Sequence, residues 1–227
     1  MTLALDHLVI AAATLEAGAQ HVAEALGVPA QPGGAHPGMG THNRLLGLFG
    51  GIYLEIIAID PAAPAPARPR WFGLDGEAVQ ARLRGGPFLL NWAARVARPA
   101  DLSLWQSQYP ARIAPVIPMT RGDLRWRITV PEDGSLPGWP ADEDGPAVAG
   151  DGVLPTLIQW DVPLHPSARL PGQGLALRAL RGRHPQAARL GRALQWLGGG
   201  ALIALEPGDK AELSAEIETP DGVRTLR

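Results

Sequence analysis

The sequence predicts an α+β fold in which repeated βαβββ-type modules form a curved, barrel-like mixed sheet with helices on its outside. Short apolar runs with the two-residue alternation of strands flank segments with helical periodicity. The order strand, helix, strand, strand occurs three times along the chain, which indicates an internal repeat. Hydrophobic residues make up 46% of the 227 residues and charged residues 19%, so the chain can bury a substantial core.

The first unit opens with a strand from residue 3 to 11, in which Asp6 and His7 interrupt an apolar run. Thr14 is placed to cap a helix over 15–26, because a threonine hydroxyl accepts from a backbone N–H of the first turn. Gly27 follows the last apolar residue of this helix and predicts its end.

A Pro/Gly-rich loop over 28–40 leads to two strand-like runs, 42–49 and 52–59, with Gly50 and Gly51 between them. A pair of glycines between strands predicts a tight two-residue hairpin, because its central positions need positive φ.

The second unit repeats this order with a strand over 87–96, a helix over 99–109 and strands over 124–130 and 154–161. The intervening stretch 131–152 is acidic and rich in Gly and Pro, which predicts a mobile loop.

The third unit has a strand over 174–180, a helix over 185–197 and strands over 201–205 and 211–219. We therefore expect a core of two modules over 1–170, at about 1–70 and 85–165, with the unit 174–227 packed on it. The exposed edges of this third unit also suggest a homodimer.

Composition excludes several classes of function. The chain has no cysteine, which excludes disulfides, thiol nucleophiles and cysteine-bound metals, so that any metal must be held by His and carboxylate groups. The net charge is −2 without a basic stripe, so nucleic acid is not the expected partner. No 18-residue apolar window or basic leader is present, and we expect a cytoplasmic protein that does not span a membrane.

Strand alternation assigns side chains to faces of the sheet. With a two-residue turn, Glu55 pairs with Leu46, and Arg44 and His42 share its face. A similar argument places His7, Arg125 and Arg127 on the face that the helices leave open. This face is a candidate binding site or a solvated surface.

The opening strand LDHLVIA with His7 and the later strand YLEIIAID with Glu55 resemble the glyoxalase-like family of the vicinal oxygen chelate superfamily. The segments GTHN (40–43), RWFGL (70–74), LRWR (124–127) and LIQW (157–160) share this resemblance. It implies that modules pair around an open curved sheet whose concave face holds the ligand. It also implies that His7 and Glu55 are catalytic residues and ligands of a divalent metal such as Zn, Mn, Ni or Fe.

The second module departs from that pattern. Trp92 stands where the first module has His7, and the strand 154–160 contains no carboxylate. In the third unit Arg178 takes the histidine position, and a guanidinium cannot bind metal. His7 and Glu55 are therefore at most half of a two-module site, and His42 could join only through a bulge or bend.

Each candidate residue also has a structural interpretation. A carboxylate at Glu55 in an apolar strand needs a compensating partner, which could be a metal, His7 or an ion pair with Arg44. Arg125 and Arg127 are either solvated or bidentate donors for an anion. Trp92 is either core or, at the position of the family's ligand, part of the pocket.

Two functions follow from these alternatives. One is an enzyme that binds a small anionic molecule on the concave face, where a divalent metal assists lyase, isomerase or dioxygenase chemistry. Its substrate-binding residues would be Arg44, His42, Trp92, Arg125 and Arg127. The other is a metal-free protein that binds or sequesters a small molecule on the same face.

Overall fold

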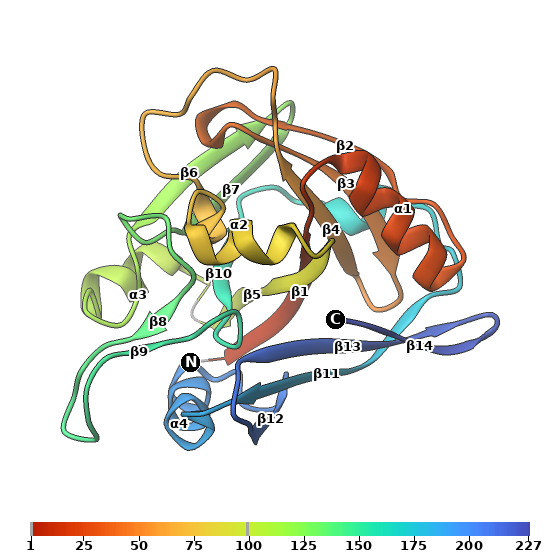
Figure 1. The fold of residues 1–227 in the computed structure, drawn as a ribbon. Helices are drawn as coiled ribbons and strands as arrows, with labels where there is room; N and C mark the ends of the chain where they lie inside the picture. The colour runs from red at the N-terminus through yellow and green to blue at the C-terminus, as the bar shows by residue number, and fades with distance from the viewer. Residues whose placement is uncertain (1, 99) are drawn as a thin grey trace.

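The computed structural model describes residues 2–98 and 100–227. Its largest sheet has eight strands in the order β2-β3-β4-β1-β5-β10-β7-β6 (Figure 1). These strands are β1 (Thr2–Ala11), β2 (Gln31–His36), β3 (Thr41–Leu48), β4 (Ile52–Ile59), β5 (Phe88–Arg98), β6 (Val116–Arg121), β7 (Leu124–Thr129) and β10 (Thr156–Trp160). Strands β1 and β5 are antiparallel at the centre, and each pairs in parallel with the last strand of its own half. The predicted α+β fold with a curved mixed sheet is thus confirmed.

The helices are α1 (Leu15–Leu26), α2 (Glu77–Leu83), α3 (Leu102–Gln108) and α4 (Ala187–Leu197), and the 3-10 turns are η1 (Pro37–Met39), η2 (Trp71–Gly73) and η3 (Pro166–Arg169). The sequence locates α1 correctly: Thr14 Oγ1 accepts from Ala17 N at 3.1 Å, and Gly27 ends the helix at φ 76°. Helix α3 begins after the Asp101 cap. The predicted start of that helix, Pro99, lies outside the described residues.

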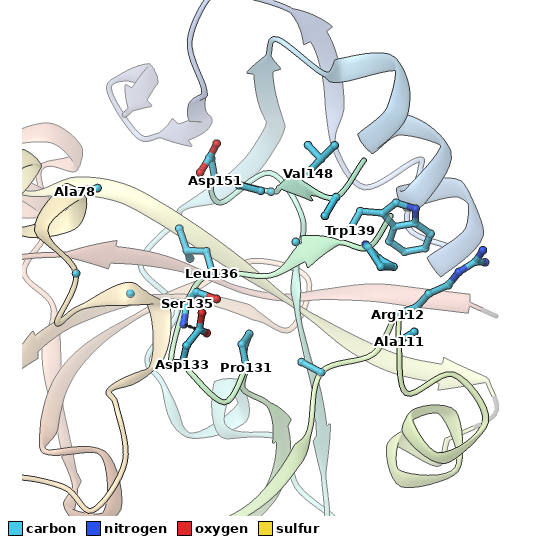
Figure 2. A pocket seen from close by; sticks show the side chains of 18 of the residues that line it. Ala78, Ala111, Arg112, Pro131, Asp133, Ser135, Leu136, Trp139, Val148 and Asp151 are labelled. Atoms are coloured by element: carbon cyan, nitrogen blue, oxygen red, sulfur yellow. Dashed lines mark hydrogen bonds between the residues drawn. The ribbon is translucent and has the colours of Figure 1, made fainter. Parts of the chain in front are cut away.

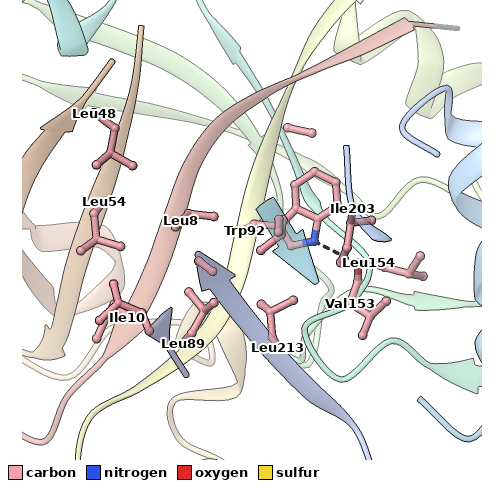
Figure 3. Packing of buried hydrophobic residues seen from close by; sticks show 14 of the residues in the cluster. Leu8, Ile10, Leu48, Leu54, Leu89, Trp92, Val153, Leu154, Ile203 and Leu213 are labelled. Atoms are coloured by element: carbon pink, nitrogen blue, oxygen red, sulfur yellow. Dashed lines mark hydrogen bonds between the residues drawn. The ribbon is translucent and has the colours of Figure 1, made fainter. Parts of the chain in front are cut away.

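The convex face of the large sheet carries the main apolar core. It is covered by α1 and by a second, four-stranded sheet in the order β12-β11-β13-β14. These strands are β11 (Ala176–His184), β12 (Ala204–Pro207), β13 (Glu212–Thr219) and β14 (Gly222–Leu226). Figure 3 shows Leu213 of β13 facing Leu8 and Leu89 of the large sheet. The C-terminal strands therefore share one core with the large sheet.

The C-terminal unit repeats the element order of the other two units but not their strand pairing. Its first strand, β11, pairs in parallel with β12 and antiparallel with β13. In the large sheet the first strand of each half pairs in parallel with the last strand of that half. The division of the chain into domains stays a prediction.

The concave face of the large sheet has a second apolar cluster. Val9 and Ala11 of β1 lie there with Trp126 and Ile128 of β7. Trp71 and Phe72 of η2 and Leu83 of α2 belong to the same cluster, so the segment between the two halves lies on this face. Helix α2 is thus an exception to the expectation that helices lie outside the barrel.

The stretch 131–152, predicted as a mobile loop, is tied to the rest of the molecule. It forms a short pair of strands, β8 (Gly138–Trp139) and β9 (Val148–Ala149), and Trp139 is buried. Arg189 Nη2 on α4 donates to Pro140 O, Asp142 Oδ1 and Gly145 O. The order of this segment therefore depends on a distant helix, which local composition cannot reveal.

Candidate functional site

A β-bulge places two neighbouring polar residues on the concave face. The pairing of β1 with β5 shifts between Leu5 and His7, so that Asp6 and His7 point to the same side. Asp6 Oδ1 lies 2.7 Å from His7 Nδ1, and both side chains are buried. Strict alternation would have placed Asp6 on the opposite face, which is why the sequence did not single it out.

Glu55 on β4 faces the other nitrogen of this histidine. His7 Nε2 lies 3.5 Å from Glu55 Oε2, and Asn43 Nδ2 donates to Glu55 Oε1 at 2.5 Å. Asn43 Oδ1 in turn accepts from Gly34 N at 2.9 Å and Arg121 Nη1 at 3.1 Å. His7 and Glu55 therefore lie next to each other, and β2, β3 and β6 extend their network. That they point into one cavity stays a prediction, since neither residue lines the hollow described below.

The buried ion pairs shift the protonation of these groups. Burial alone would lower the pKa of His7, but hydrogen bonds with Asp6 and Glu55 outweigh it and raise this pKa to about 9. Burial would raise the pKa of Glu55, but the bond to His7 lowers it to about 2. The pKa of Asp6 is likewise held well below its usual value by His165 and His7, against the effect of burial. At neutral pH an imidazolium therefore lies between two carboxylates.

Two further histidines reach the site although sequence analysis assigned them no chemistry. His165 Nε2 lies 3.0 Å from Asp6 Oδ2, which also accepts from Trp160 Nε1 at 3.0 Å. His36 Nε2 lies 3.2 Å from Arg121 Nη1. Burial, together with the positive charge of Arg121, lowers the pKa of His36 to about 4, although the negative charge of Glu55 acts in the opposite direction. Both histidines adjoin a proline in loop-like sequence, which carries no signal of their position.

The register of the hairpin corrects two predicted site residues. The turn contains three residues, Phe49 to Gly51, so Glu55 pairs with Leu45 rather than Leu46. Phe49 N donates to Leu175 O instead of closing a two-residue turn. Arg44 and His42 consequently lie on the convex side of the sheet, away from Glu55.

The other predicted substrate-binding residues also lie elsewhere. Trp92 pairs with Leu8, is fully buried in the convex core, and donates from Nε1 to Val153 O (Figure 3). Arg125 and Arg127 alternate with Trp126, which packs on the concave face, so they point outward. Arg127 binds Asp161 at 2.9 Å, which occupies it in an outer ion pair. These three residues therefore do not share the concave face with His7 and Glu55 as predicted, because Trp92 is packed in the convex core and the two arginines lie on the opposite side of β7 from Trp126.

A hollow of about 760 Å³ lies over the network at the edges of the large sheet. Gly33 and Gly34 of β2, Leu45 of β3 and Arg121 of β6 contribute to its lining. Strands β2 and β6 are the two edge strands of the sheet, so the hollow lies where the barrel stays open. Pro166 of η3 also lines it, and this brings the segment that carries His165 to its rim.

Gly33 is required for the close approach of β2 to Asn43. A Cβ at this position would lie 2.0 Å from Asn43 Oδ1 and 2.6 Å from Asn43 O. We expect Gly33→Ala to displace Asn43 and to lower the free energy of unfolding by about 1–3 kcal/mol, as overpacking typically does. Urea unfolding measures this change, and Gly38→Ala is the control because a Cβ there meets nothing within 4 Å. Equal stability of the two variants would contradict the tight approach.

The donor set does not fit a resident metal ion. His7 Nε2 and Glu55 Oε2 face each other, but within residues 2–98 and 100–227 no three His, Asp or Glu side chains are placed to hold a metal. A catalytic zinc site typically has three protein ligands. Metal binding would also have to displace the proton that two carboxylates hold on His7.

Comparisons with known proteins relate the fold to solved structures. A hypothetical protein from Staphylococcus aureus has a TM-score of 0.61 at 15% identity, with 93% of this chain and 88% of that chain covered. Methylmalonyl-CoA epimerase from Mycobacterium tuberculosis has a TM-score of 0.41 at 16% identity, with 69% and 85% covered. A Streptomyces coelicolor methylmalonyl-CoA epimerase in complex with 2-nitronate-propionyl-CoA has a TM-score of 0.41 at 16% identity, with 70% and 97% covered.

The sequence itself gives a more direct assignment. No curated protein matches it. The family model of the glyoxalase-like domain matches residues 5–198, which include His7, Glu55 and all strands of the large sheet from β2 to β10. The chain therefore belongs to the glyoxalase-like domain family.

Proposed function

We propose that this protein binds a small anionic molecule in the hollow between β2 and β6, without a resident metal ion. The observation that carries this proposal is the position of Arg121. Its Nη1 is fixed by Asn43 and His36, and no hydrogen bond from its Nε or Nη2 is found in the described part of the chain. A guanidinium that is held in place with free donors suits a carboxylate or phosphate.

The buried ion pairs support this function by fixing Arg121 and its neighbours. Asn43 bridges Glu55 and Arg121, so the orientation of the guanidinium depends on the His7–Glu55 pair behind it. In this proposal His7 and Glu55 position the binding groups.

Metal-assisted chemistry is the alternative. One observation favours it. Asp6 binds Nδ1 of His7 and leaves Nε2 directed at Glu55. Metal-binding histidines commonly have a carboxylate on the ring nitrogen that does not bind the metal, and Asp6 has this position. A third ligand would then have to come from the bound molecule or from water. In that case His7 and Glu55 are catalytic.

Titration with inorganic phosphate and with malonate, followed by NMR, tests the proposal. We expect Arg121→Gln to weaken binding of the better probe at least ten-fold, because the charged donor is lost. Arg84→Gln, at an exposed position on the C-terminal end of α2, is the matched control and should bind like the parent protein. Unchanged binding by Arg121→Gln would overturn the proposal.

Elemental analysis separates the two alternatives. We expect far less than one equivalent of Mn, Ni, Zn or Fe in the purified protein and after incubation with each ion. Near-stoichiometric metal that is lost in both His7→Ala and Glu55→Ala would instead support the metal-assisted function.

Of the helices in the described residues, none is long and apolar enough to cross a membrane.

The cellular location and the oligomeric state stay predictions. Residence in the cytoplasm and formation of a homodimer rest on the sequence arguments alone, and sedimentation of the full chain tests the second.

A further inference from the structure

A serine, a histidine and an aspartate are joined by hydrogen bonds at the concave face of the large sheet. Ser167 Oγ lies 2.7 Å from His165 Nδ1, and His165 Nε2 lies 3.0 Å from Asp6 Oδ2. Asp6 is fully buried, whereas His165 and Ser167 are partly exposed. A hydroxyl within hydrogen-bond distance of a base that a third group orients is the arrangement of serine nucleophiles.

The hydrogen-bond partners of His165 fix the tautomer of its ring. Ser167 N lies 3.3 Å from Nδ1, and a backbone N–H can only donate, so Nδ1 carries the lone pair of the neutral imidazole. The ring hydrogen is then on Nε2 and is donated to Asp6 Oδ2. Nδ1 therefore also accepts from the Ser167 hydroxyl and is the atom that can take up its proton.

Asp6 is itself held in place, so the orientation of His165 is fixed. Asp6 Oδ2 accepts from Trp160 Nε1 at 3.0 Å, and its Oδ1 lies 2.7 Å from His7 Nδ1. The ring of His165 also lies between two aromatic rings, with its centre 5.9 Å from that of Tyr53 and 5.6 Å from that of Trp160. These contacts restrict rotation of the imidazole and keep Nδ1 directed at Ser167.

The surroundings of Ser167 leave its hydroxyl accessible. Gly51 lies beside it in the turn between β3 and β4, and a Cβ at this glycine would be 3.9 Å from Ser167 Oγ. The absence of a side chain at Gly51 keeps the space next to the hydroxyl open. Two neighbours of Ser167 in η3, Pro166 and Arg169, line the hollow at Arg121, so the serine lies close to the rim of that hollow.

Ser135 shows that exposure of a hydroxyl does not by itself produce this arrangement. It lines a different hollow, of about 610 Å³, between the stretch 131–152 and the start of α2 (Figure 2). Ser135 is more exposed than Ser167, but none of the described residues that line its hollow is a histidine. Ser135 N instead donates to Asp133 Oδ1 at 3.0 Å. Ser135 is therefore a matched serine without a base.

We propose that Ser167 is the nucleophile of a second site, which hydrolyses small, uncharged carboxylic esters. The site favours small substrates because Ser167 lies near the surface, and uncharged ones because Arg169 beside it is already paired with Asp123. The proposal does not rest on the anion-binding function, since it makes no use of the guanidinium at the hollow.

Each step of this reaction uses an atom of the Ser167–His165 pair. Ser167 Oγ attacks the carbonyl carbon while its proton passes to His165 Nδ1. The bond from that carbon to the ester oxygen breaks, and the leaving alcohol takes the proton from Nδ1. Water then attacks the acyl group on Oγ and gives a proton to Nδ1, which returns it to Oγ as the carboxylic acid leaves. Asp6 positions the imidazole and stabilises its charged form.

Reaction with diisopropyl fluorophosphate, followed by mass spectrometry of the intact protein and its peptides, tests the nucleophile. In this reaction the bond from Oγ to phosphorus forms, the bond from phosphorus to fluorine breaks, and fluoride leaves. We expect one adduct per chain, on Ser167, and none in Ser167→Ala. His165→Gln should slow the reaction at least about a hundred-fold, which is the usual lower contribution of a general base. Ser135→Ala is the matched control and should react at the rate of the parent protein.

Hydrolysis of p-nitrophenyl acetate tests the positioning role of Asp6. Asp6→Asn should lower kcat at least about ten-fold and leave KM within about two-fold, because the substrate contacts Ser167 and not the carboxylate. Thermal midpoints check that each variant is folded. Absence of an adduct in the parent protein, or an adduct on another residue, would overturn the proposal. Equal reaction rates of folded His165→Gln and the parent would also overturn it, since the contact between Ser167 and His165 would then only cap η3.

Discussion

Replacing Asp6 with alanine is expected to lower the free energy of unfolding by about 3–5 kcal/mol, the usual cost of removing one member of a buried ion pair. Asp6 is fully buried and accepts from His7 Nδ1, Trp160 Nε1 and His165 Nε2. These donors come from β1, β10 and the segment before η3. The variant leaves them without their shared acceptor and removes one of the two carboxylates that stabilise charged His7.

Urea unfolding at pH 6.5 measures this loss. Asp221→Ala is the matched control, because Asp221 is exposed at the turn between β13 and β14 and should change stability little. Asp6→Asn keeps the shape of the side chain and should lie between the parent and Asp6→Ala. If Asp6→Ala is as stable as the Asp221 variant, the carboxylate is not the centre of a buried network.

The sequence predicts those parts of the fold that local signals encode. Thr14 and Gly27 mark the ends of α1 because capping depends on the residue at the helix end. The family resemblance also predicts two modules that pair around one curved sheet, which the eight-stranded sheet contains. Strand β2, in contrast, lies within a Pro/Gly-rich stretch, and Gly33 is required by the contact with Asn43 rather than by a strand signal.

The candidate site was predictable only where simple alternation holds. His7 and Glu55 meet as expected, but one bulge brings Asp6 to their face and one extra turn residue moves Arg44 and His42 away from it. His36, Arg121 and His165 enter the site from segments distant in the sequence. Their positions depend on tertiary contacts, which a single sequence does not display.

The stability of the protein should pass through a maximum near pH 6.5. His7 has a folded pKa of about 9, above its unfolded value of 6.5, so its contribution is complete below pH 6.5 and is lost as pH rises toward 9. One unit of pKa corresponds to about 1.4 kcal/mol, so the loss over this range is roughly 3 kcal/mol. On the acid side, His36 has a pKa of about 4 in the folded protein, below its value of 6.5 in the unfolded chain. The unfolded chain therefore takes up the proton first, and stability falls as pH falls from 6.5 toward 4. Glu55 has a pKa of about 2 in the folded protein against 4.5 in the unfolded chain, so it adds a further loss of stability below pH 4.5.

Urea unfolding at intervals from pH 4 to 9 measures both sides of this maximum, and two variants assign them. His7→Gln cannot titrate, so its stability should no longer fall between pH 6.5 and 9, while the loss below pH 6.5 remains. His36→Gln should keep the loss of stability between pH 6.5 and 9, because that loss depends on His7 between its two carboxylates. It should reduce the loss of stability below pH 6.5, because that loss depends on the neutral imidazole of His36 beside Arg121. A parent profile that stays level up to pH 9 would mean that His7 is neutral in the folded protein, and the ion pairs that orient Asn43 and Arg121 would then be absent.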